Sequence, residues 1–340
     1  MNELLLSCDW GTSNFRLRLV DLNTKEIRAE VLSDTGISSA HLTWKTSQLQ
    51  KTVTKADFYT KLLEDYLSQL SAKSQTDIRN IPLVISGMAS STLGIFSLPY
   101  ASIPFDISGK DLVIKTLILN SNFVHDVFLI SGISDNKDVL RGEETELIGV
   151  FEWLKRQSIS LKKIAAFIFP GTHSKHIFLE EEEIRGFSTY ITGELFMLMN
   201  SKSILKESVS PPDTFHQLAE EDLQAFSEGV KLSQTSGLLK NLFTVRSNRL
   251  FDVFDKTRNY FFLSGLLIGS ELIELKSSCV DEVVLCSGRN VYDFYRVALE
   301  KLQIQAKLIP AAVMDTVAVE GHLRVFKDVI IGNKQYEKNG

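Results

Sequence analysis

The chain has 340 residues, of which 44% are hydrophobic and 23% are charged. These are ordinary values for a globular protein, and the length exceeds what one hydrophobic core usually supports, which predicts two domains. The formal net charge of −5 argues against a general nucleic-acid binder, because such proteins usually present a basic face.

The cysteine content and the hydropathy of the chain indicate the cellular compartment of the protein. The three cysteines, Cys8, Cys279 and Cys286, have no CxxC spacing, so neither a disulfide framework nor a zinc site is predicted. No run reaches the roughly 18 apolar residues that span a bilayer. We therefore expect a cytoplasmic protein with neither a membrane nor a nucleic acid as its partner.

Residues 3–31 have the pattern of a three-stranded meander. An apolar strand is expected over 4–8, an alternating, half-buried strand over 15–20, and a third extended segment over 26–32. The turn between the first two strands consists of small and polar residues. These include Gly11, Thr12, Ser13 and Asn14.

Residues 164–189 repeat this plan. An apolar strand over 164–169 is followed by a turn and by two further strands, over 175–179 and 184–190. The run of glutamates from 180 to 183 is expected to be a solvated hairpin tip rather than a metal site. The turn after the first strand contains Gly171, Thr172, His173 and Ser174.

The two meanders lie one domain's length apart, which predicts a duplicated domain rather than a solenoid of short repeats. Gly11 and Gly171 occupy matching places in them. Small residues let the backbone approach an anion, successive N–H groups form an anion-binding nest, and hydroxyls add donors. Either turn alone would read as an ordinary hairpin, but the matched pair favours a clamp on a polyphosphate.

Between the meanders, residues 141–154 have helical spacing. The apolar positions Leu147, Val150, Phe151 and Leu154 share one face. Glu143 and Glu144 stand near the start of this helix, where negative charge offsets the positive end of the helix dipole. Dipole compensation alone would explain them.

Two later segments have recognisable patterns. Residues 283–286 form an apolar strand, Ser287 and Gly288 a small-residue turn, and a helix is expected over 291–302. A nucleotide could pass over such a glycine turn, although many α/β folds contain one. Residues 264–272 read as a buried helix whose glycines permit close packing.

Five motifs stand in one order along the chain, and together they closely resemble the 2-dehydro-3-deoxygalactonokinase family, the kinases of 2-keto-3-deoxygalactonate. The resemblance runs from the N-terminus to about residue 300. The ordered set is specific, whereas no single motif is. The motifs are Asp9–Ser13, Arg141–Thr145, Pro170–Lys175, Thr192–Phe196 and Ser264–Gly269.

The resemblance implies a two-lobed α/β actin-like ATPase (ribonuclease H-like) fold, a duplicated domain with a central cleft. The N-terminal lobe, 1–160, would bind the sugar acid and carry the first phosphate turn. The C-terminal lobe, 161–340, would carry the second turn and bind adenosine, with the last helix a candidate to pack on the N-terminal lobe. ATP and Mg²⁺ would serve as cofactors.

The resemblance also implies a reaction, phosphorylation of the C6 hydroxyl of 2-dehydro-3-deoxy-D-galactonate in galactonate catabolism. Asp9 matches the superfamily aspartate that handles Mg²⁺, usually through water, although a turn-capping aspartate would look the same. The two turns would bind the phosphates, and Ser287 and Gly288 the adenosine.

Other sugar kinases of the superfamily carry an aspartate in the second turn, but this turn has no carboxylate, so the resemblance implies that the base lies elsewhere. Related hexokinase-like enzymes carry an aspartate at the start of the equivalent connecting helix, where it takes the proton of the attacking hydroxyl. By that comparison Glu143 or Glu144 is the base, and the sequence does not choose between them.

Several residues are candidates to bind the sugar acid. Arg141 suits a carboxylate or a phosphate because its guanidinium presents a planar fork of donors. Lys175 could neutralise transferring charge, hold the substrate carboxylate or be an ordinary strand lysine. Ser90 and Ser91 lie in the segment 87–95, for which the family typically reads Gly-Met-Val-Gly-Ser-Arg-Gln-Gly-Trp.

That segment departs from the family pattern, because Thr92, Leu93 and Ile95 replace Arg, Gln and Trp. His176 also stands where the family usually has Trp. The departures leave open a kinase of a different sugar, sugar acid or amino sugar. A non-catalytic actin-like nucleotide-binding protein is a second alternative, and the oligomeric state stays open, with a homodimer as one option.

Overall fold

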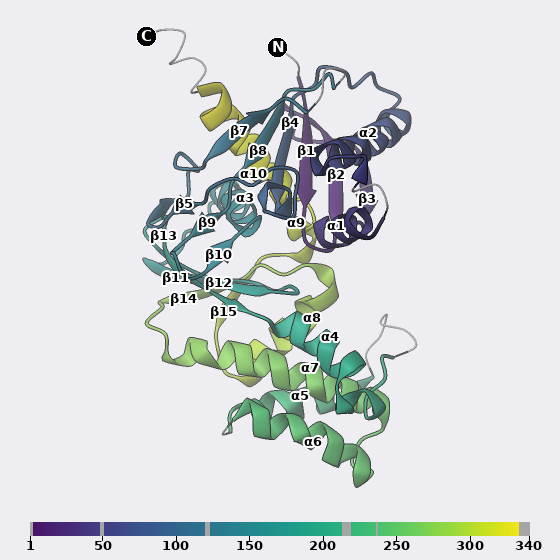
Figure 1. Ribbon diagram of the computed structural model, residues 1–340. Helices are drawn as coiled ribbons and strands as arrows, with labels where there is room; N and C mark the ends of the chain where they lie inside the picture. Colours follow the sequence, from purple (N-terminus) through teal and green to yellow (C-terminus); the bar gives the residue numbers. More distant parts are fainter. Residues whose placement is uncertain (1–2, 48–50, 120–122, 213–218, 236, 333–340) are drawn as a thin grey trace. The chain divides into compact units, whose positions relative to one another are not determined.

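The computed structural model describes residues 3–47, 51–119, 123–212, 219–235 and 237–332 (Figure 1). The chain forms two compact units. The first comprises the described residues of 1–160, 182–185 and 315–340, and the second comprises those of 161–181 and 186–314.

The first unit is built on a six-stranded mixed sheet with the strand order β3-β2-β1-β4-β8-β7. The strands are β1 (Leu4–Trp10), β2 (Phe15–Asp21), β3 (Ile27–Ser33), β4 (Leu83–Gly87), β7 (Ile114–Leu117) and β8 (Val127–Ile130). β1, β2 and β3 are the predicted antiparallel meander, and β1 pairs in parallel with β4, as β4 does with β8. Asp9 and Trp10 belong to β1 rather than to the turn, because they pair with Arg16 and Phe15.

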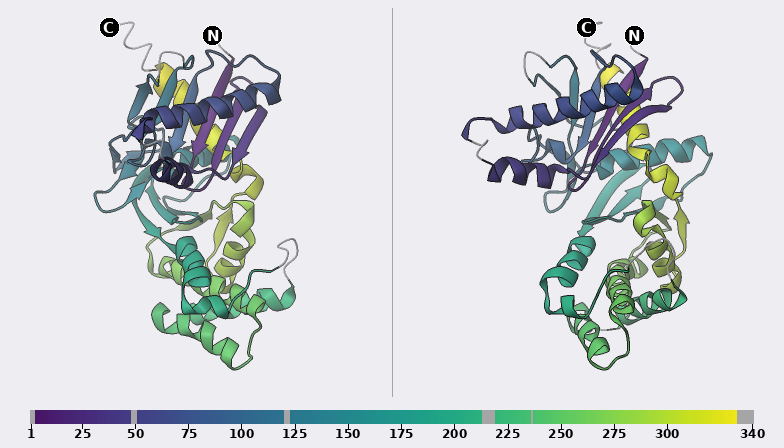
Figure 2. Two further views of the ribbon diagram at one scale, coloured as in Figure 1. Left: turned by 45° about the vertical axis from the view of Figure 1, so that its right-hand side comes forward. Right: turned by 90° about the vertical axis from the view of Figure 1, so that its right-hand side faces the viewer.

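Helices cover both faces of this sheet (Figure 2). The helices α1 (Ile37–Thr46) and α2 (Lys55–Ser74) lie on one face, and α3 (Glu143–Arg156) and α10 (Val317–Arg324) on the other. Alternate residues of β1 point to opposite faces. Trp10 is fully buried on the α2 side, with its ring centroid 5.5 Å from that of Tyr59, whereas Ser7 bonds His322 of α10.

Smaller elements complete the first unit. A three-stranded sheet has the order β10-β9-β5, a short 3₁₀ helix η2 follows β4, and a π-helix η5 follows α10. Their bounds are β5 (Ala101–Ser102), β9 (Ile133–Ser134), β10 (Val139–Leu140), η2 (Met88–Ser90) and η5 (Val325–Ile331).

The second unit repeats the plan of the first. Its strands are β11 (Ile164–Phe169), β12 (Ser174–Glu180), β13 (Glu183–Tyr190), β14 (Glu282–Leu285) and β15 (Ala306–Leu308). Their order, β15-β14-β11-β12-β13, mirrors β8-β4-β1-β2-β3, with β11 antiparallel to β12 and parallel to β14. The start of β13, which belongs to the first unit, also pairs with β6 (Phe105–Asp106). The predicted duplication is therefore confirmed.

The predicted hairpin tip is confirmed as well. Glu181 and Glu182 are exposed and adopt positive φ angles of 52° and 69°, so they form the turn between β12 and β13. Ser174, expected in the phosphate turn, is instead the first residue of β12.

The second unit is rich in helices, and their bounds are α4 (Thr192–Lys202), η3 (Ile204–Glu207), α5 (Glu220–Ser233), α6 (Leu238–Leu250), α7 (Lys256–Leu272), η4 (Ile273–Ser277), α8 (Arg289–Lys301) and α9 (Ala311–Met314). The predicted helices after Gly288 and around 264–272 correspond to α8 and α7. None of the helices within the described ranges is long and apolar enough to cross a membrane.

Glycines let helices approach closely in both units. In the second unit, a Cβ at Gly265 of α7 would lie well inside van der Waals contact with the Phe226 carbonyl of α5. In the first unit, Gly149 of α3 and Gly321 of α10 meet in the same way, since a Cβ at either would clash with the backbone of the opposite helix. The expectation that the glycines of 264–269 permit close packing is confirmed.

Substitution of Gly265 should therefore loosen the α5–α7 contact. We expect Gly265→Ala to destabilise the second unit by about 1–3 kcal/mol, the usual cost of overpacking a tight core. Thermal unfolding checks this. Gly186→Ala is the matched control, because a Cβ at Gly186 meets nothing within 4 Å. Equal melting temperatures for the two variants would contradict the packing argument.

Candidate active site

The first phosphate turn is held by the helix that follows its meander. The Gly11 N–H donates to the Asn14 carbonyl at 2.9 Å and closes the hairpin. At the start of α1, the Ile37 N–H donates to the Gly11 carbonyl at 3.0 Å and the Ser38 N–H to the Thr12 carbonyl at 3.1 Å. Gly36 permits this contact, because a Cβ there would overlap the Thr12 carbonyl.

The second turn is held in the same way by α4. The Glu194 N–H donates to the Thr172 carbonyl at 2.9 Å, and a Cβ at Gly193 would lie 2.5 Å from the Gly171 carbonyl oxygen. His173 Nε2 lies 2.5 Å from Glu194 Oε2. Thr192 is the first residue of α4, and no side chain caps this helix. Gly193 instead serves the close approach of helix and turn.

Each turn thus has its carbonyls bonded by a helix N-terminus, which fixes the backbone of the turn. A rigid turn with small side chains is what an anion-binding nest requires. Ser13, Asn14 and Gly171 are exposed, so a ligand can reach both turns. The residues Gly36 and Gly193 could have been found from the sequence, because each stands a few residues after the third strand of its meander.

Asp9 lies near the end of β1 in the first unit. Arg16 Nη1 of β2 donates to Asp9 Oδ2 at 2.7 Å, which orients the carboxylate. Gly87, at the end of the neighbouring β4, has φ +82°, and a Cβ there would lie 2.7 Å from the Trp10 carbonyl oxygen and 3.5 Å from Asp9 Oδ1. Gly87 therefore keeps the space beside Asp9 open, a role that the sequence did not single out.

The start of α3 lies next to Gly87. Gly142 has φ +116°, and a Cβ there would lie 3.4 Å from the Gly87 Cα. Glu143 Oε2 accepts the Arg141 N–H at 2.8 Å, and Glu144 Oε2 accepts the Gly142 N–H at 2.7 Å. Both glutamates thus bond backbone donors at the helix start, yet they differ in access, since Glu144 is 1% exposed and Glu143 is half-buried.

Two carboxyl groups near this helix start, those of Glu144 and Glu146, have raised pKa values. Burial raises the pKa of Glu144 to about 7, and the charge of Glu143 adds to the shift. The side chain of Glu146 is partly exposed, but the surrounding protein removes much of the water around its carboxyl group. This desolvation, followed by the charges of Asp9 and Glu143, raises the pKa of Glu146 to about 8. The acidic cluster of Asp9, Glu143 and Glu146 was missed, although Glu146 shares a helix face with Glu143 at the i, i+3 spacing.

Asp9 is the candidate ligand for a magnesium ion. In the part of the chain that the structure describes, no three histidine, cysteine or acidic side chains converge to hold an ion. Mg²⁺ needs no such cage, because it keeps several waters and takes only one or two carboxylates together with phosphate oxygens. A single oriented aspartate such as Asp9 fits that requirement.

Arg141 organises the predicted sugar side of the first unit. Its Nη1 donates to the carbonyl of Ser90 and lies 2.7 Å from Ser90 Oγ, while the guanidinium carbon lies 4.2 Å from the ring centroid of Tyr100. Ser90 is fully buried, and Ser91 donates its hydroxyl to the Met88 carbonyl at 2.7 Å. The two serines therefore shape the segment internally, and Tyr100 had no signal in the sequence.

The segment that departs from the family pattern is fastened to α2. Lys55 Nζ donates to the Thr92 carbonyl at 2.7 Å, and the Tyr59 hydroxyl donates to the Leu93 carbonyl at 2.8 Å. Ile95 is 5% exposed and belongs to the core, whereas Leu93 is 36% exposed. Of these replacements, Thr92 and Leu93 alter the surface and Ile95 alters the packing.

The remaining predicted residues lie in the second unit. Lys175 is buried and donates to Thr189 Oγ1 at 2.7 Å. Ser174 and Ser287 are fully buried, and Ser287 bonds the carbonyl of Gly288 at 3.1 Å. Gly288 itself is exposed at the start of α8. The structure thus presents Gly288 to a ligand, while both serine hydroxyls point to protein partners.

Comparisons with known proteins show the family of the chain. The family model of 2-keto-3-deoxy-galactonokinase matches residues 9–324. The protein named "Probable 2-dehydro-3-deoxygalactonokinase DgoK1" of Rhizobium meliloti is 30% identical over 314 residues, covering 89% of this chain and 91% of its own. The 2-dehydro-3-deoxygalactonokinase of Escherichia coli is 28% identical over 242 residues, covering 68% of this chain and 75% of its own.

Solved structures give the same result. One, described as "a putative 2-dehydro-3-deoxygalactonokinase protein from Sinorhizobium meliloti", has a TM-score of 0.73 and 26% identity and covers 94% of this chain and 96% of its own. The (R)-2-hydroxyglutaryl-CoA dehydratase component A of Acidaminococcus fermentans, at 15% identity, has a TM-score of 0.50, covers 96% and 99% of the two chains, and shares the fold alone. The predicted actin-like α/β fold is confirmed.

The raised pKa of Glu144 makes stability depend on pH. Between its ordinary value of 4.5 and about 7, folded protein keeps a proton that unfolded protein releases, so stability falls as pH rises. From pH 5 to pH 8, the wild type should lose up to about 3 kcal/mol more of unfolding free energy than Glu144→Gln. Urea unfolding at both pH values measures this, with Glu152→Gln, farther along the same helix, as control. Identical pH dependence in wild type and Glu144→Gln would refute it.

Proposed function

Because the chain belongs to the 2-keto-3-deoxy-galactonokinase family and is a sugar-acid kinase, we propose that it transfers the γ-phosphoryl group of ATP to the C6 hydroxyl of 2-dehydro-3-deoxy-D-galactonate. The observation that carries this proposal is the acidic start of α3 beside Gly87 and Asp9. We place the reaction in galactonate catabolism in the cytoplasm.

The two turns are proposed to donate N–H groups to the phosphates of ATP. Support comes from their matched construction, in which Gly36 and Gly193 let a helix start fix each turn. Little covalent work falls to the protein in phosphoryl transfer, where positioning and charge stabilisation dominate. Rigid turns suit that task, since they need no reorganisation when the phosphates arrive. The adenosine would lie against Gly288, which is exposed directly before α8.

Mg²⁺ would be held by Asp9 and would neutralise charge that develops on the phosphoryl group. Arg16 keeps the Asp9 carboxylate in one orientation through the 2.7 Å bond. Glu146, whose raised pKa keeps it largely protonated at neutral pH, adds little negative charge of its own beside Asp9.

Glu143 is proposed as the base that accepts the proton of the C6 hydroxyl. A base must reach that proton within hydrogen-bond distance, and Glu143 is accessible whereas Glu144 is buried. Glu144 would position it, because its bond to the Gly142 N–H orders the helix start. Arg141 would receive the sugar carboxylate, with its guanidinium orientation set by Ser90 and Tyr100.

Substitution distinguishes the two glutamates. Glu143→Gln should lower kcat by about 10²–10⁴-fold, the usual value of general-base help, with a small effect on the KM for ATP. Glu144→Gln keeps an oxygen for the Gly142 N–H and should lower kcat much less. Glu152→Gln, two turns along α3, serves as control, and steady-state kinetics provide the measurement. Wild-type turnover in Glu143→Gln would remove it as the base.

A substrate panel tests the proposed acceptor. The wild type should phosphorylate 2-dehydro-3-deoxy-D-galactonate with a kcat/KM at least about tenfold above that for neutral hexoses, because Arg141 would lose a charged partner. A coupled ADP assay measures the rates, with phosphate release in the absence of sugar as background. Equal rates on glucose, or rapid hydrolysis without any sugar, would overturn the proposal.

A further inference from the structure

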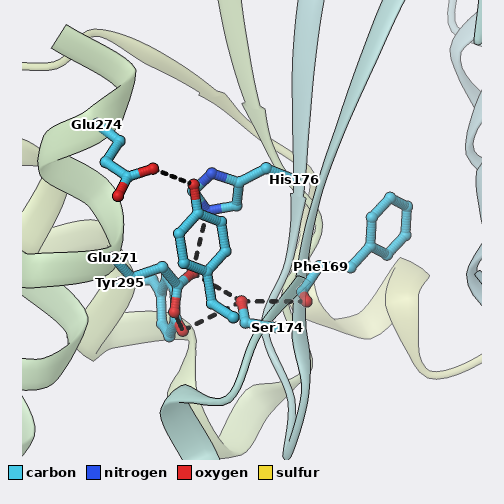
Figure 3. A network of polar contacts seen from close by, with 7 residues as sticks. Phe169, Ser174, His176, Glu271, Glu274 and Tyr295 are labelled. Atoms are coloured by element: carbon cyan, nitrogen blue, oxygen red, sulfur yellow. Dashed lines mark hydrogen bonds and ion pairs between the residues drawn. The ribbon is translucent and has the colours of Figure 1, made fainter. Parts of the chain in front are cut away.

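A buried polar network lies directly behind the second phosphate turn, within the second unit (Figure 3). At its centre is Glu271 of α7, whose side chain is 1% exposed. Glu271 Oε1 accepts the Ser174 hydroxyl at 2.7 Å and lies 3.1 Å from His176 Nε2, and Oε2 accepts the Tyr295 hydroxyl at 2.8 Å. The network joins β12, α7 and α8.

A carboxylate so deeply buried is tolerated only when donors surround it. Glu271 has three, from Ser174, His176 and Tyr295. Burial and the charge of Glu271 raise the pKa of Tyr295 well above its ordinary range, so its hydroxyl stays a donor. Moving Glu271 away would leave these donors without an acceptor in the interior, which costs free energy. The network is therefore expected to hold its side chains in one arrangement.

The tautomer of His176 follows from its surroundings. Among the described residues, Nδ1 of this buried ring has no hydrogen-bond partner. A protonated ring would leave an N–H donor unsatisfied there, whereas the neutral tautomer with its proton on Nε2 leaves only a lone pair. His176 therefore donates through Nε2 to Glu271, and the ring of Tyr190 covers it with centroids 4.5 Å apart.

The network reaches both predicted nucleotide-binding segments of the unit. Ser174 immediately follows the turn, and its hydroxyl also lies 3.4 Å from the Phe169 carbonyl at the other side of that turn. Tyr295 lies on α8, which begins directly after Gly288. The turn is therefore fastened at two places, by the Glu194 N–H of α4 at the Thr172 carbonyl and by Glu271 at Ser174.

We infer that Glu271 is a positioning residue for nucleotide phosphates. It fixes Ser174, and through it the turn at 170–173, relative to the α8 segment that carries Gly288. Glu271 itself touches no ligand. The inference rests on the proposed binding of ATP phosphates at this turn, and it predicts that loss of Glu271 weakens the grip on phosphates rather than on adenosine.

The test compares nucleotides that differ in phosphate number, using the full-length protein. Glu271→Gln should raise the Kd for ATP and the KM for ATP about tenfold, the loss expected for one hydrogen bond to a charged group. The Kd for AMP and the KM for the sugar acid should stay at wild-type values. Calorimetry gives the affinities and steady-state kinetics the KM values.

A double-mutant cycle adds a second readout. If Glu271 acts through Ser174, then Ser174→Ala should have a similar ATP-selective effect. The Kd of the double variant for ATP should then be about the same as that of either single variant. Ser174→Ala also carries the test alone if Glu271→Gln fails to fold. Glu274→Gln is the matched control, because Glu274 is exposed and bonds the Tyr190 hydroxyl instead.

Several outcomes would overturn the inference. One is an equal loss of AMP and ATP affinity in the variants, which would indicate a general structural role. Others are unchanged ATP binding in Ser174→Ala, or effects of the two substitutions that multiply independently. A wild type that binds no ATP would refute the proposed function itself, whereas a wild type that binds ATP while the variants behave like it would refute only this inference.

Discussion

The close contact between each phosphate turn and the helix start behind it is the constraint on which the rest of the structure depends. Gly36 and Gly193 stand where any Cβ would clash with a turn carbonyl, so helix N–H groups can bond those carbonyls directly. This contact occurs twice because the meander, its turn and its helix are duplicated. The turns are therefore rigid before any ligand arrives, and electrostatic preorganisation needs that rigidity.

Rigidity of the turns is matched by a concentration of charge at one place in the first unit. Gly87 and Gly142 bring the end of β4 and the start of α3 together beside the end of β1. Carboxyl groups from separate segments lie there, and burial, followed by repulsion from neighbouring carboxylates, raises the pKa values of Glu144 and Glu146. Perturbed titration of this kind clusters at functional sites. It is consistent with a site built to handle protons and phosphate charge, as a sugar-acid kinase requires.

The second unit has the same strand order as the first but a different arrangement of charged side chains behind its turn. Its turn also meets an acidic helix start, that of α4 with Glu194, and it contains in addition a buried carboxylate, Glu271, whose donors come from β12 and α8. The half-buried Glu143 of the first unit is accessible, whereas the carboxylate of Glu271 is buried and accepts hydrogen bonds from three side chains. The two turns therefore differ in the charged groups around them, although their backbones are built alike.

The sequence by itself determined the meanders, their duplication and the family. Alternating apolar residues and glycine turns are local patterns, and β11, which begins at Ile164 and ends at Phe169, has the predicted limits. The five ordered motifs identified a kinase family that the comparisons confirm. The tertiary structure decided which side chains meet. The charge of Asp9 acts on Glu146, and Glu271 accepts a hydrogen bond from Ser174, across long stretches of chain. It also decided that Ser174 and Ser287 face inward, because burial depends on neighbours from distant segments, and no local pattern records those neighbours.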